Sequence, residues 1–204
     1  MLTLYGAKGS GAAAVEAALR ITGQPFKWVD AATWEPGPGL EALKQVNPLA
    51  QIPTLVLDDG SVMTESAAIL IWLGLRHPES DLLPRDNAQA IRGLTFIAAN
   101  CYAAIGVIDY PERFCADFDK ATGERIRAGT KARLHQYWDM FADQFVLFKE
   151  NRLGALEILA AVVSRWSGAR THVKTSRPRF HGLLENVEAD PRIARVFERH
   201  WPPK

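Results

Sequence analysis

The sequence has few cysteines and no excess of charge of either sign. Its 204 residues include 2 cysteines, Cys101 and Cys115, and neither lies in a CxxC motif or near a histidine cluster. A zinc site is therefore not expected. Lys and Arg number 24 against 23 Asp and Glu, so the net charge is +1. Such a balance creates no field that attracts nucleic acid or an acidic membrane surface.

Targeting and membrane signals are also missing from the sequence. The N-terminus lacks the charged and apolar regions of a secretory signal, and no apolar run is expected to reach the roughly 20 residues that span a bilayer. With 48% hydrophobic and 23% charged residues, the composition is that of a globular protein. We therefore expect a soluble protein of a reducing compartment, most simply the cytoplasm, with Cys101 as a small core residue.

The first part of the chain predicts strands that alternate with helices. The Asp59-Gly60 turn between two apolar runs predicts a hairpin. Thr64 is a predicted N-cap for the apolar helix that follows it. Predicted strands lie at residues 2–5, 26–30, 52–57 and 61–64, and predicted helices at residues 11–20, 40–46 and 65–76.

Beyond Asp81 the sequence predicts helices alone. Two apolar stripes at helical spacing cover residues 91–108 and 126–148, the second ending at Phe148, and residues 156–166 are apolar on all sides. Helix starts are predicted at Asp86 with Gln89, at Gly154 with Glu157, and at Asp190 with Pro191. The expected fold class is thus α/β plus all-α, with a βαβ–ββα domain over residues 1–78 and an all-helical domain over residues 86–204.

The glycine-rich turn before the first helix has two interpretations. Residues 9–14 (GSGAAA) fit the dinucleotide-binding pattern G-x-G-x-x-A, and Asp30 ends the next strand about 20 residues later. A dinucleotide-binding sheet needs further βαβ units, whereas here a hairpin and then helices follow. NAD binding therefore stays the weaker alternative.

The second interpretation starts from Ile52-Pro53. A cis proline at the start of a strand leaves the main chain of Ile52 free to pair with an extended peptide. Thr64-Glu65-Ser66 opens a helix nearby, whose unpaired N–H groups suit a carboxylate, and the charge of Glu65 suits an ammonium group. A short peptide with an amino-acid end, such as glutathione, presents matching groups.

These segments resemble the glutathione S-transferase family. The likeness is carried by residues 2–19, 47–55 (NPLAQIPTL) and 59–66 (DGSVMTES), with a generic helical half that includes residues 154–157 (GALE). The resemblance implies a thioredoxin-like N-terminal domain, an all-helical C-terminal domain and a homodimer. It also implies glutathione as co-substrate, with no prosthetic group and no metal.

Carried over by position, the resemblance assigns a glutathione site. Ile52, ahead of a cis Pro53, would pair with the cysteinyl backbone of glutathione, and Glu65 and Ser66 would hold the γ-glutamyl end. Gln51 would assist with the backbone or the glycyl end. The electrophile pocket would be lined by Tyr102, Tyr110, Arg113 and Phe114, while Trp34 is a candidate dimer contact.

The catalytic group departs from the family's pattern. The cysteine of bacterial members is replaced by Gly11, and the tyrosine of some animal classes would align with Leu4 or Tyr5. Ser10 is the remaining candidate, as a hydrogen-bond donor to the sulfur or as a plain helix N-cap, with a backbone N–H as the alternative donor. Lowering a thiol pKa by about two units takes roughly 2.7 kcal/mol. A hydrogen bond to a charged group supplies about 1.5–3 kcal/mol and a helix N-terminus about 0.3–1 kcal/mol.

Three functional hypotheses follow from the sequence. The first is a transferase that activates the glutathione thiolate for attack on a small hydrophobic electrophile. The second is a non-catalytic protein of the same fold that binds ligands or partners, and the third is an NAD-binding protein. The sequence does not identify the electrophile.

Overall fold

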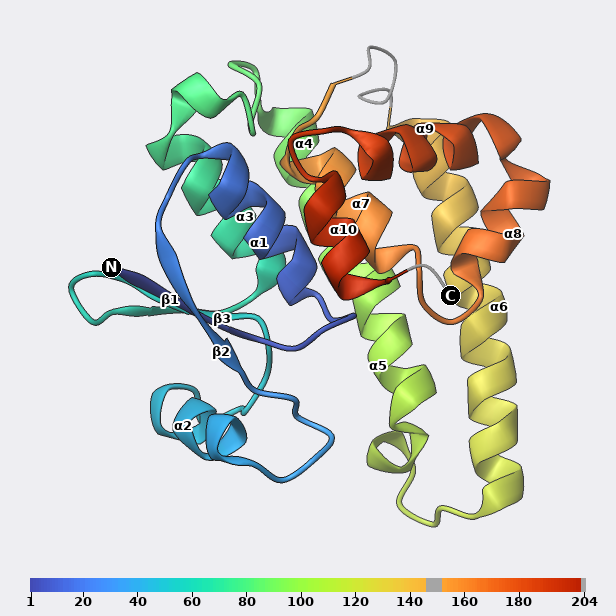
Figure 1. The fold of residues 1–204 in the computed structure, drawn as a ribbon. Coiled ribbons are helices and arrows are strands. Elements are labelled where there is room, and N and C mark those ends of the chain that lie inside the picture. Colours follow the sequence, from blue (N-terminus) through green and yellow to red (C-terminus); the bar gives the residue numbers. More distant parts are fainter. Residues whose placement is uncertain (146–151, 203–204) are drawn as a thin grey trace.

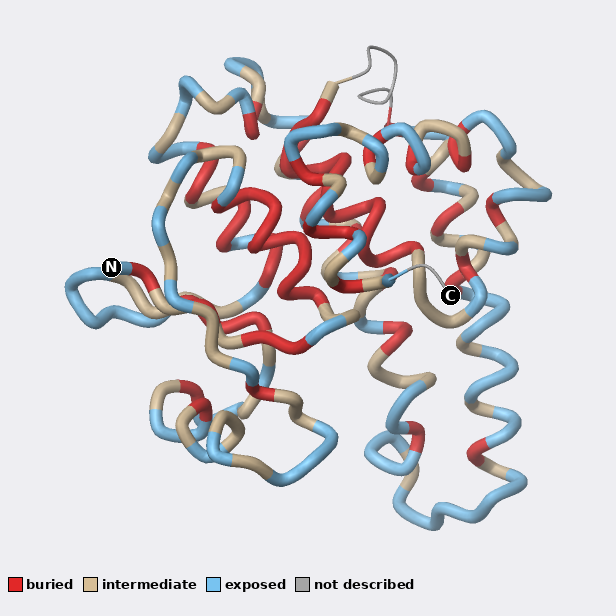
Figure 2. The backbone as a smooth tube through the Cα atoms, in the orientation of Figure 1, coloured by how far each residue is buried: buried red, intermediate tan, exposed pale blue. Residues whose placement is uncertain are grey.

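The computed structural model describes residues 1–145 and 152–202. A small sheet and its helices form one region, and a larger set of helices packs beside it (Figure 1). The central helices of the two regions are the most buried parts of the described chain (Figure 2). The core thus runs through both regions.

The sheet has four strands in the order β2-β1-β3-β4. Strand β1 pairs with β2 in parallel and with β3 antiparallel, so that Leu4 lies opposite both Trp28 and Leu55. The predicted hairpin at Asp59-Gly60 is present, with Gly60 at a φ of +83° and β3 antiparallel to β4. The strands are β1 (Leu2–Gly6), β2 (Phe26–Asp30), β3 (Thr54–Val56) and β4 (Val62–Met63).

The helices of this region complete the thioredoxin-like βαβ–ββα order. Helices α1 and α3 lie on one face of the sheet and α2 on the other (Figure 1). No third parallel strand follows within the described residues, which excludes the dinucleotide-binding topology. The helices are α1 (Ala12–Ile21), α2 (Pro38–Val46) and α3 (Ser66–Arg76).

The second region is all-helical, as predicted. Helix α7 (Ala155–Val163) is buried at every position, begins after Gly154, and has Glu157 accepting the Gly154 N–H (Oε2···N 3.1 Å). It packs against α1, α3 and α4, so the two regions share a core, and the limits 1–78 and 86–204 stay a prediction. The other helices are α4 (Ala88–Phe96), α5 (Ala103–Asp109), α6 (Lys120–Gln144), α8 (Ala169–Ser176), α9 (Pro178–Ala189) and α10 (Ala194–His200).

Several predicted helix ends were wrong. Helix α3 starts one residue after the expected position, with Glu65 rather than Thr64 at the N-cap. Helix α4 starts after Asn87 without the Asp86 capping box. Asp190 instead accepts the Arg192 N–H in a turn, and α10 begins later, at Ala194. In all three cases the helix begins without the side-chain cap that the sequence predicted.

The two long apolar stripes are present with changes. A π-helical segment, η2 (Ile97–Tyr102), joins α4 to α5 in one continuous run. Helix α6 ends at Gln144, so Phe145 is buried beyond the helix, and Phe148 lies outside the described residues. The run Ala88–Asp109 is long and apolar enough to cross a membrane, with a mean hydropathy of 1.5 over its best window, contrary to our expectation. The run contacts α6 and α7, and 33% of this apolar window is buried.

Candidate functional site

A cavity of about 580 Å³ lies between the two regions and is lined by both. It brings together every residue that the sequence assigned to the site. Those residues are Ser10, Gln51, Ile52, Pro53, Glu65, Ser66, Tyr102, Tyr110, Arg113 and Phe114. Neither Leu4 nor Tyr5 is among the lining residues, which removes Tyr5 as a candidate thiol partner.

One side of the cavity, here called the first wall, consists of Gln51, Ile52, Pro53, Glu65 and Ser66. The Ile52–Pro53 peptide bond is cis, as predicted. Among the described residues, no hydrogen bond involves the N–H or the C=O of Ile52. This main chain is therefore available to a ligand.

Local hydrogen bonds hold the loop before Ile52 in place. The carbonyl of Gln51 accepts from Thr54 Oγ1 at 2.7 Å and from Asn47 Nδ2 at 3.1 Å. Asn47 is buried and also donates to Thr54 Oγ1 at 2.9 Å. The segment from Asn47 to Thr54 thus satisfies its own polar groups and leaves Ile52 open.

The first wall also contains the N-terminus of α3. Glu65 has a φ of +63°, in the left-handed region that non-glycine residues seldom adopt. No side chain caps the helix, so the N–H groups of Ser66 and Ala67 face the cavity without the usual partner. No ion pair or hydrogen bond of the Glu65 carboxylate is found among residues 1–145 and 152–202. A free carboxylate therefore lies beside free N–H groups.

The turn at Ser10 uses its hydroxyl internally. Ser10 Oγ donates to the Ala7 carbonyl at 2.7 Å and accepts the Ala12 N–H at 3.2 Å. Gly11 forms the N-cap of α1 and lines the cavity. Ser10 therefore shapes the turn before α1, while the N-cap position that the sequence left open for it is occupied by Gly11.

Contacts from the C-terminal helices anchor the same turn. The Gly9 N–H donates to His200 Nδ1 at 3.1 Å, and Trp166 Nε1 donates to the Gly9 carbonyl at 3.2 Å. Because Nδ1 accepts, the proton of a neutral His200 lies on Nε2, which contacts the Glu16 carboxylate at 3.0 Å. Burial raises the pKa of Glu16, but hydrogen bonding to His200 and the charge of Arg199 outweigh this effect and lower it overall. No local sequence pattern indicates this anchor, because the partners lie more than 150 residues apart in the chain.

The opposite side, here called the second wall, consists of Tyr102, Asp109, Tyr110, Arg113 and Phe114. The Arg113 guanidinium lies 3.9 Å from the centre of the Tyr110 ring. Phe114 is 61% exposed and belongs to the short 3-10 turn Pro111–Phe114. Burial raises the pKa of Asp109. This wall offers aromatic surface with a few charges.

Sequence reasoning missed several lining residues. Asp109 and Trp166 line the cavity, as does Trp34, which is 60% exposed and which we had considered only as a dimer contact. Asp109 could have been found from the helical spacing, because it lies seven residues after Tyr102 and hence on the same face. Trp166 follows the end of α7 in a turn, where no periodicity applies.

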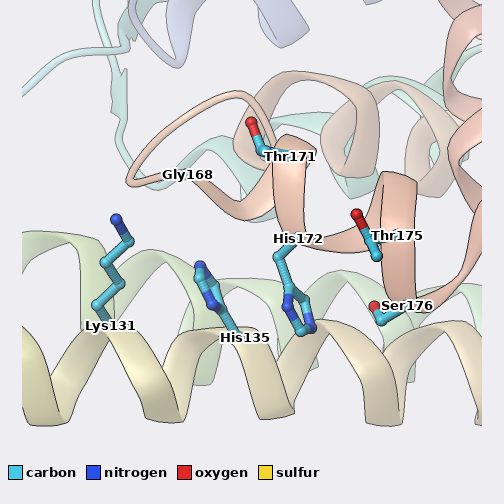
Figure 3. Close-up of a pocket in the computed structure, with 7 residues that line it drawn as sticks. All are labelled: Lys131, His135, Gly168, Thr171, His172, Thr175 and Ser176. Carbon is cyan, nitrogen blue, oxygen red and sulfur yellow. The ribbon is translucent and has the colours of Figure 1, made fainter.

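A second cavity of about 570 Å³ lies between α6 and α8 (Figure 3). The stacked rings of His135 and His172, 4.3 Å apart, lie on one side of it, and His172 Nε2 contacts Asp139 at 3.0 Å. Among the described residues, no group of three or more His, Cys, Asp or Glu side chains could hold a metal ion. The cavity between the two regions, with its open main chain, is therefore the better candidate site.

A protein-family model matches the N-terminal part of the chain. Residues 4–81 match the family model described as glutathione S-transferase, N-terminal domain. Residues 4–81 are thus similar to the N-terminal domain of the glutathione S-transferases. The resemblance that the sequence suggested is thereby confirmed for this part.

Curated relatives of this glutathione S-transferase-like chain match it in part. It is 38% identical over 122 residues, 57% of the chain, to the uncharacterized GST-like protein YncG of Escherichia coli K12. It is 42% identical over 69 residues, 34% of the chain, to a protein named probable maleylacetoacetate isomerase in Caenorhabditis elegans. The matches span 58% and 30% of the relatives' own lengths.

A solved structure matches the chain over its whole length. It is a glutathione transferase homolog from Sulfitobacter with bound glutathione, 22% identical, with a TM-score of 0.81 over 97% of each chain. At this level of identity the likeness establishes the fold. The thioredoxin-like sheet followed by a helical region is thus the fold of a known transferase homolog.

Proposed function

We propose that this chain is a transferase that binds glutathione in the cavity between its two regions and activates the thiol for attack on a small hydrophobic electrophile. The observation that carries the proposal is the unpaired main chain of Ile52 beside the uncapped N-terminus of α3. The homolog with bound glutathione supports the same choice of ligand.

The first wall matches the three polar parts of glutathione. The N–H and C=O of Ile52 would pair with the cysteinyl residue, as a strand edge pairs with a peptide. The γ-glutamyl carboxylate would bind the N–H groups of Ser66 and Ala67, and its ammonium group would face Glu65. Gln51 lies at the same edge, where the glycyl end would extend.

The reaction then occurs between the two walls. The thiol proton passes to solvent, and the thiolate forms a bond to the electrophilic carbon. In a substitution, the leaving group departs with its electron pair; in an addition, the carbon skeleton of the electrophile accepts the electron pair. The N-terminus of α1 stabilises the thiolate by its dipole. Tyr110, Arg113 and Phe114 of the second wall would contact the electrophile.

The proposal includes the assembly and the compartment. Exposed Leu49, Val62 and Leu75 offer apolar surface for a second copy, so a homodimer is proposed, and size-exclusion chromatography with light scattering would measure it. The near-neutral net charge of +1 supports the proposal of a soluble, cytoplasmic protein.

One observation favours a second function. Because Ser10 donates its proton to Ala7, the catalytic role first assigned to it lacks a free donor. A non-catalytic glutathione-binding protein would have this arrangement too.

Calorimetric titration with glutathione and with cysteinylglycine tests the binding mode. The first should bind and the second should bind much more weakly, since it lacks the γ-glutamyl end. Conjugation of a panel that includes 1-chloro-2,4-dinitrobenzene then separates the two functions. Binding without conjugation of any electrophile would favour the non-catalytic protein, and the absence of binding would contradict both.

A further inference from the structure

The hydroxyl nearest to the start of α1 from the opposite wall belongs to Tyr102. A Cβ placed on Gly11 would lie 2.4 Å from the Tyr102 hydroxyl oxygen, so this oxygen sits directly over the N-cap of the helix. Any side chain at position 11 would displace it. The absence of a side chain at Gly11 therefore makes room for a hydroxyl from the other region.

Surrounding contacts hold the Tyr102 ring in this place. Tyr102 ends the π-helical segment η2, a kind of helical irregularity that is frequent at functional sites. Its ring lies 5.5 Å from that of Trp166, which is itself fixed by its hydrogen bond to the Gly9 carbonyl. The ring that carries the hydroxyl and the turn that carries Gly11 thus share one anchor.

The hydroxyl groups of Ser10 and Tyr102 both lie near the start of α1, but they differ in whether the hydroxyl proton is free to be donated. The Ser10 proton is used by the Ala7 carbonyl. In the described part of the chain, no acceptor takes a hydrogen bond from the Tyr102 hydroxyl. Burial raises the pKa of Tyr102 to about 12, with the negative charges of Glu65 and Asp109 acting in the same direction and the Gly11 amide opposing them. The phenol therefore keeps its proton at neutral pH.

We propose that the Tyr102 hydroxyl donates a hydrogen bond to the sulfur of bound glutathione and stabilises the thiolate, while Ser10 only shapes the turn. This inference rests on the proposed function. Tyr102 stays protonated throughout, because the thiol proton goes to solvent before the carbon–sulfur bond forms. The donor thus comes from the second region, and the site is complete only when both regions are present.

The test compares the thiol pKa of bound glutathione in wild type and in Tyr102→Phe. This pKa is measured from the ultraviolet absorbance of the thiolate as a function of pH. Loss of a hydrogen bond to a charged group should raise this pKa by about 1 to 2 units, with the dissociation constant for glutathione changed less than threefold near pH 6, where the thiol is bound protonated. Tyr137→Phe, which removes a hydroxyl from α6 outside the cavity, is the matched control and should leave the pKa unchanged.

Gly11→Ala provides an independent variant, because its methyl group displaces the Tyr102 oxygen while the phenol remains. It should raise the thiol pKa in the same direction. An unchanged thiol pKa in Tyr102→Phe would overturn the inference, and so would a larger rise of the thiol pKa in Ser10→Ala than in Tyr102→Phe. In either case, the proposed function stands as long as the protein binds glutathione. If wild type does not bind glutathione at all, the proposed function itself fails.

Discussion

In the proposed function, the two walls of the cavity would recognise ligands in different ways. The first wall acts mainly through the main chain of Ile52 and the start of α3, with Glu65 as its charged side chain. The second wall acts through side chains, among them Tyr110, Arg113 and Phe114 on the helix end and turn that follow Tyr102. Main-chain recognition depends on local geometry and tolerates sequence change, whereas side-chain recognition changes with every substitution. The first wall thus suits a constant co-substrate and the second a variable one.

The largest expected effect concerns Glu157, a buried residue in the first turn of α7. Burial raises the pKa of Glu157 to about 7, from an ordinary value of 4.5. The folded protein therefore retains a proton that the unfolded chain loses between these values, and the free energy of unfolding falls as pH rises through this window. The full effect is about 3 kcal/mol. Glu157→Gln keeps an acceptor for the Gly154 N–H and should remove this pH dependence from urea unfolding curves.

Exposed Glu124 on α6 provides the control for this prediction. Glu124→Gln should leave the pH dependence of the wild type unchanged. Equal slopes of unfolding free energy against pH in wild type and Glu157→Gln would show that the buried carboxyl does not titrate in this range. Because α7 packs on both α1 and α4, we expect the titration of Glu157 to change the free energy of unfolding of the protein. We do not expect it to change how the two walls differ in ligand recognition.

The second prediction sharpens the role of the first wall. Glu65→Gln keeps the size of the side chain and removes its charge, so the ammonium group of glutathione loses a charge-assisted partner. The dissociation constant should rise roughly 10- to 100-fold in calorimetry. Glu35→Gln, in the nearby loop, is the matched control. The idea fails if Glu65→Gln binds glutathione as tightly as that control.

The smallest expected effect belongs to the second wall. Phe114→Ala removes an exposed aromatic side chain from the electrophile side. The KM for a hydrophobic electrophile should rise roughly fivefold, which corresponds to the loss of about 1 kcal/mol of aromatic contact. The KM for glutathione should stay constant, as should both constants in Phe118→Ala in the next loop. A change in the glutathione KM instead would show that the walls do not divide the two substrates.

Sequence predicted the first wall better than the second for a physical reason. Residues 47–66 contain proline, glycine and asparagine, whose local preferences fix the loop, the hairpin and the start of α3. Even there, the positive φ of Glu65 was not foreseen, because non-glycine residues seldom adopt it. The hairpin between β3 and β4, by contrast, follows from the short-range Asp59-Gly60 pattern.

The second wall depends on contacts that no local pattern encodes. The position of Tyr102 over Gly11 arises from the packing of two regions that are separated by some 90 residues. The anchoring of Gly9 by His200 and Trp166 is of the same kind. The sequence therefore assigned Tyr102 to the electrophile and the catalytic role to Ser10, whereas the structure places the free hydroxyl on Tyr102.

The central claim is that glutathione pairs with the main chain of Ile52. Amide chemical shifts of the ¹⁵N-labelled protein, followed during titration with glutathione, test it most directly. We predict the largest changes at the amides of Ile52, Ser66 and Ala67, with slowed hydrogen exchange at Ile52. Saturable binding with these three amides unchanged, and shifts elsewhere in the protein, would contradict the account.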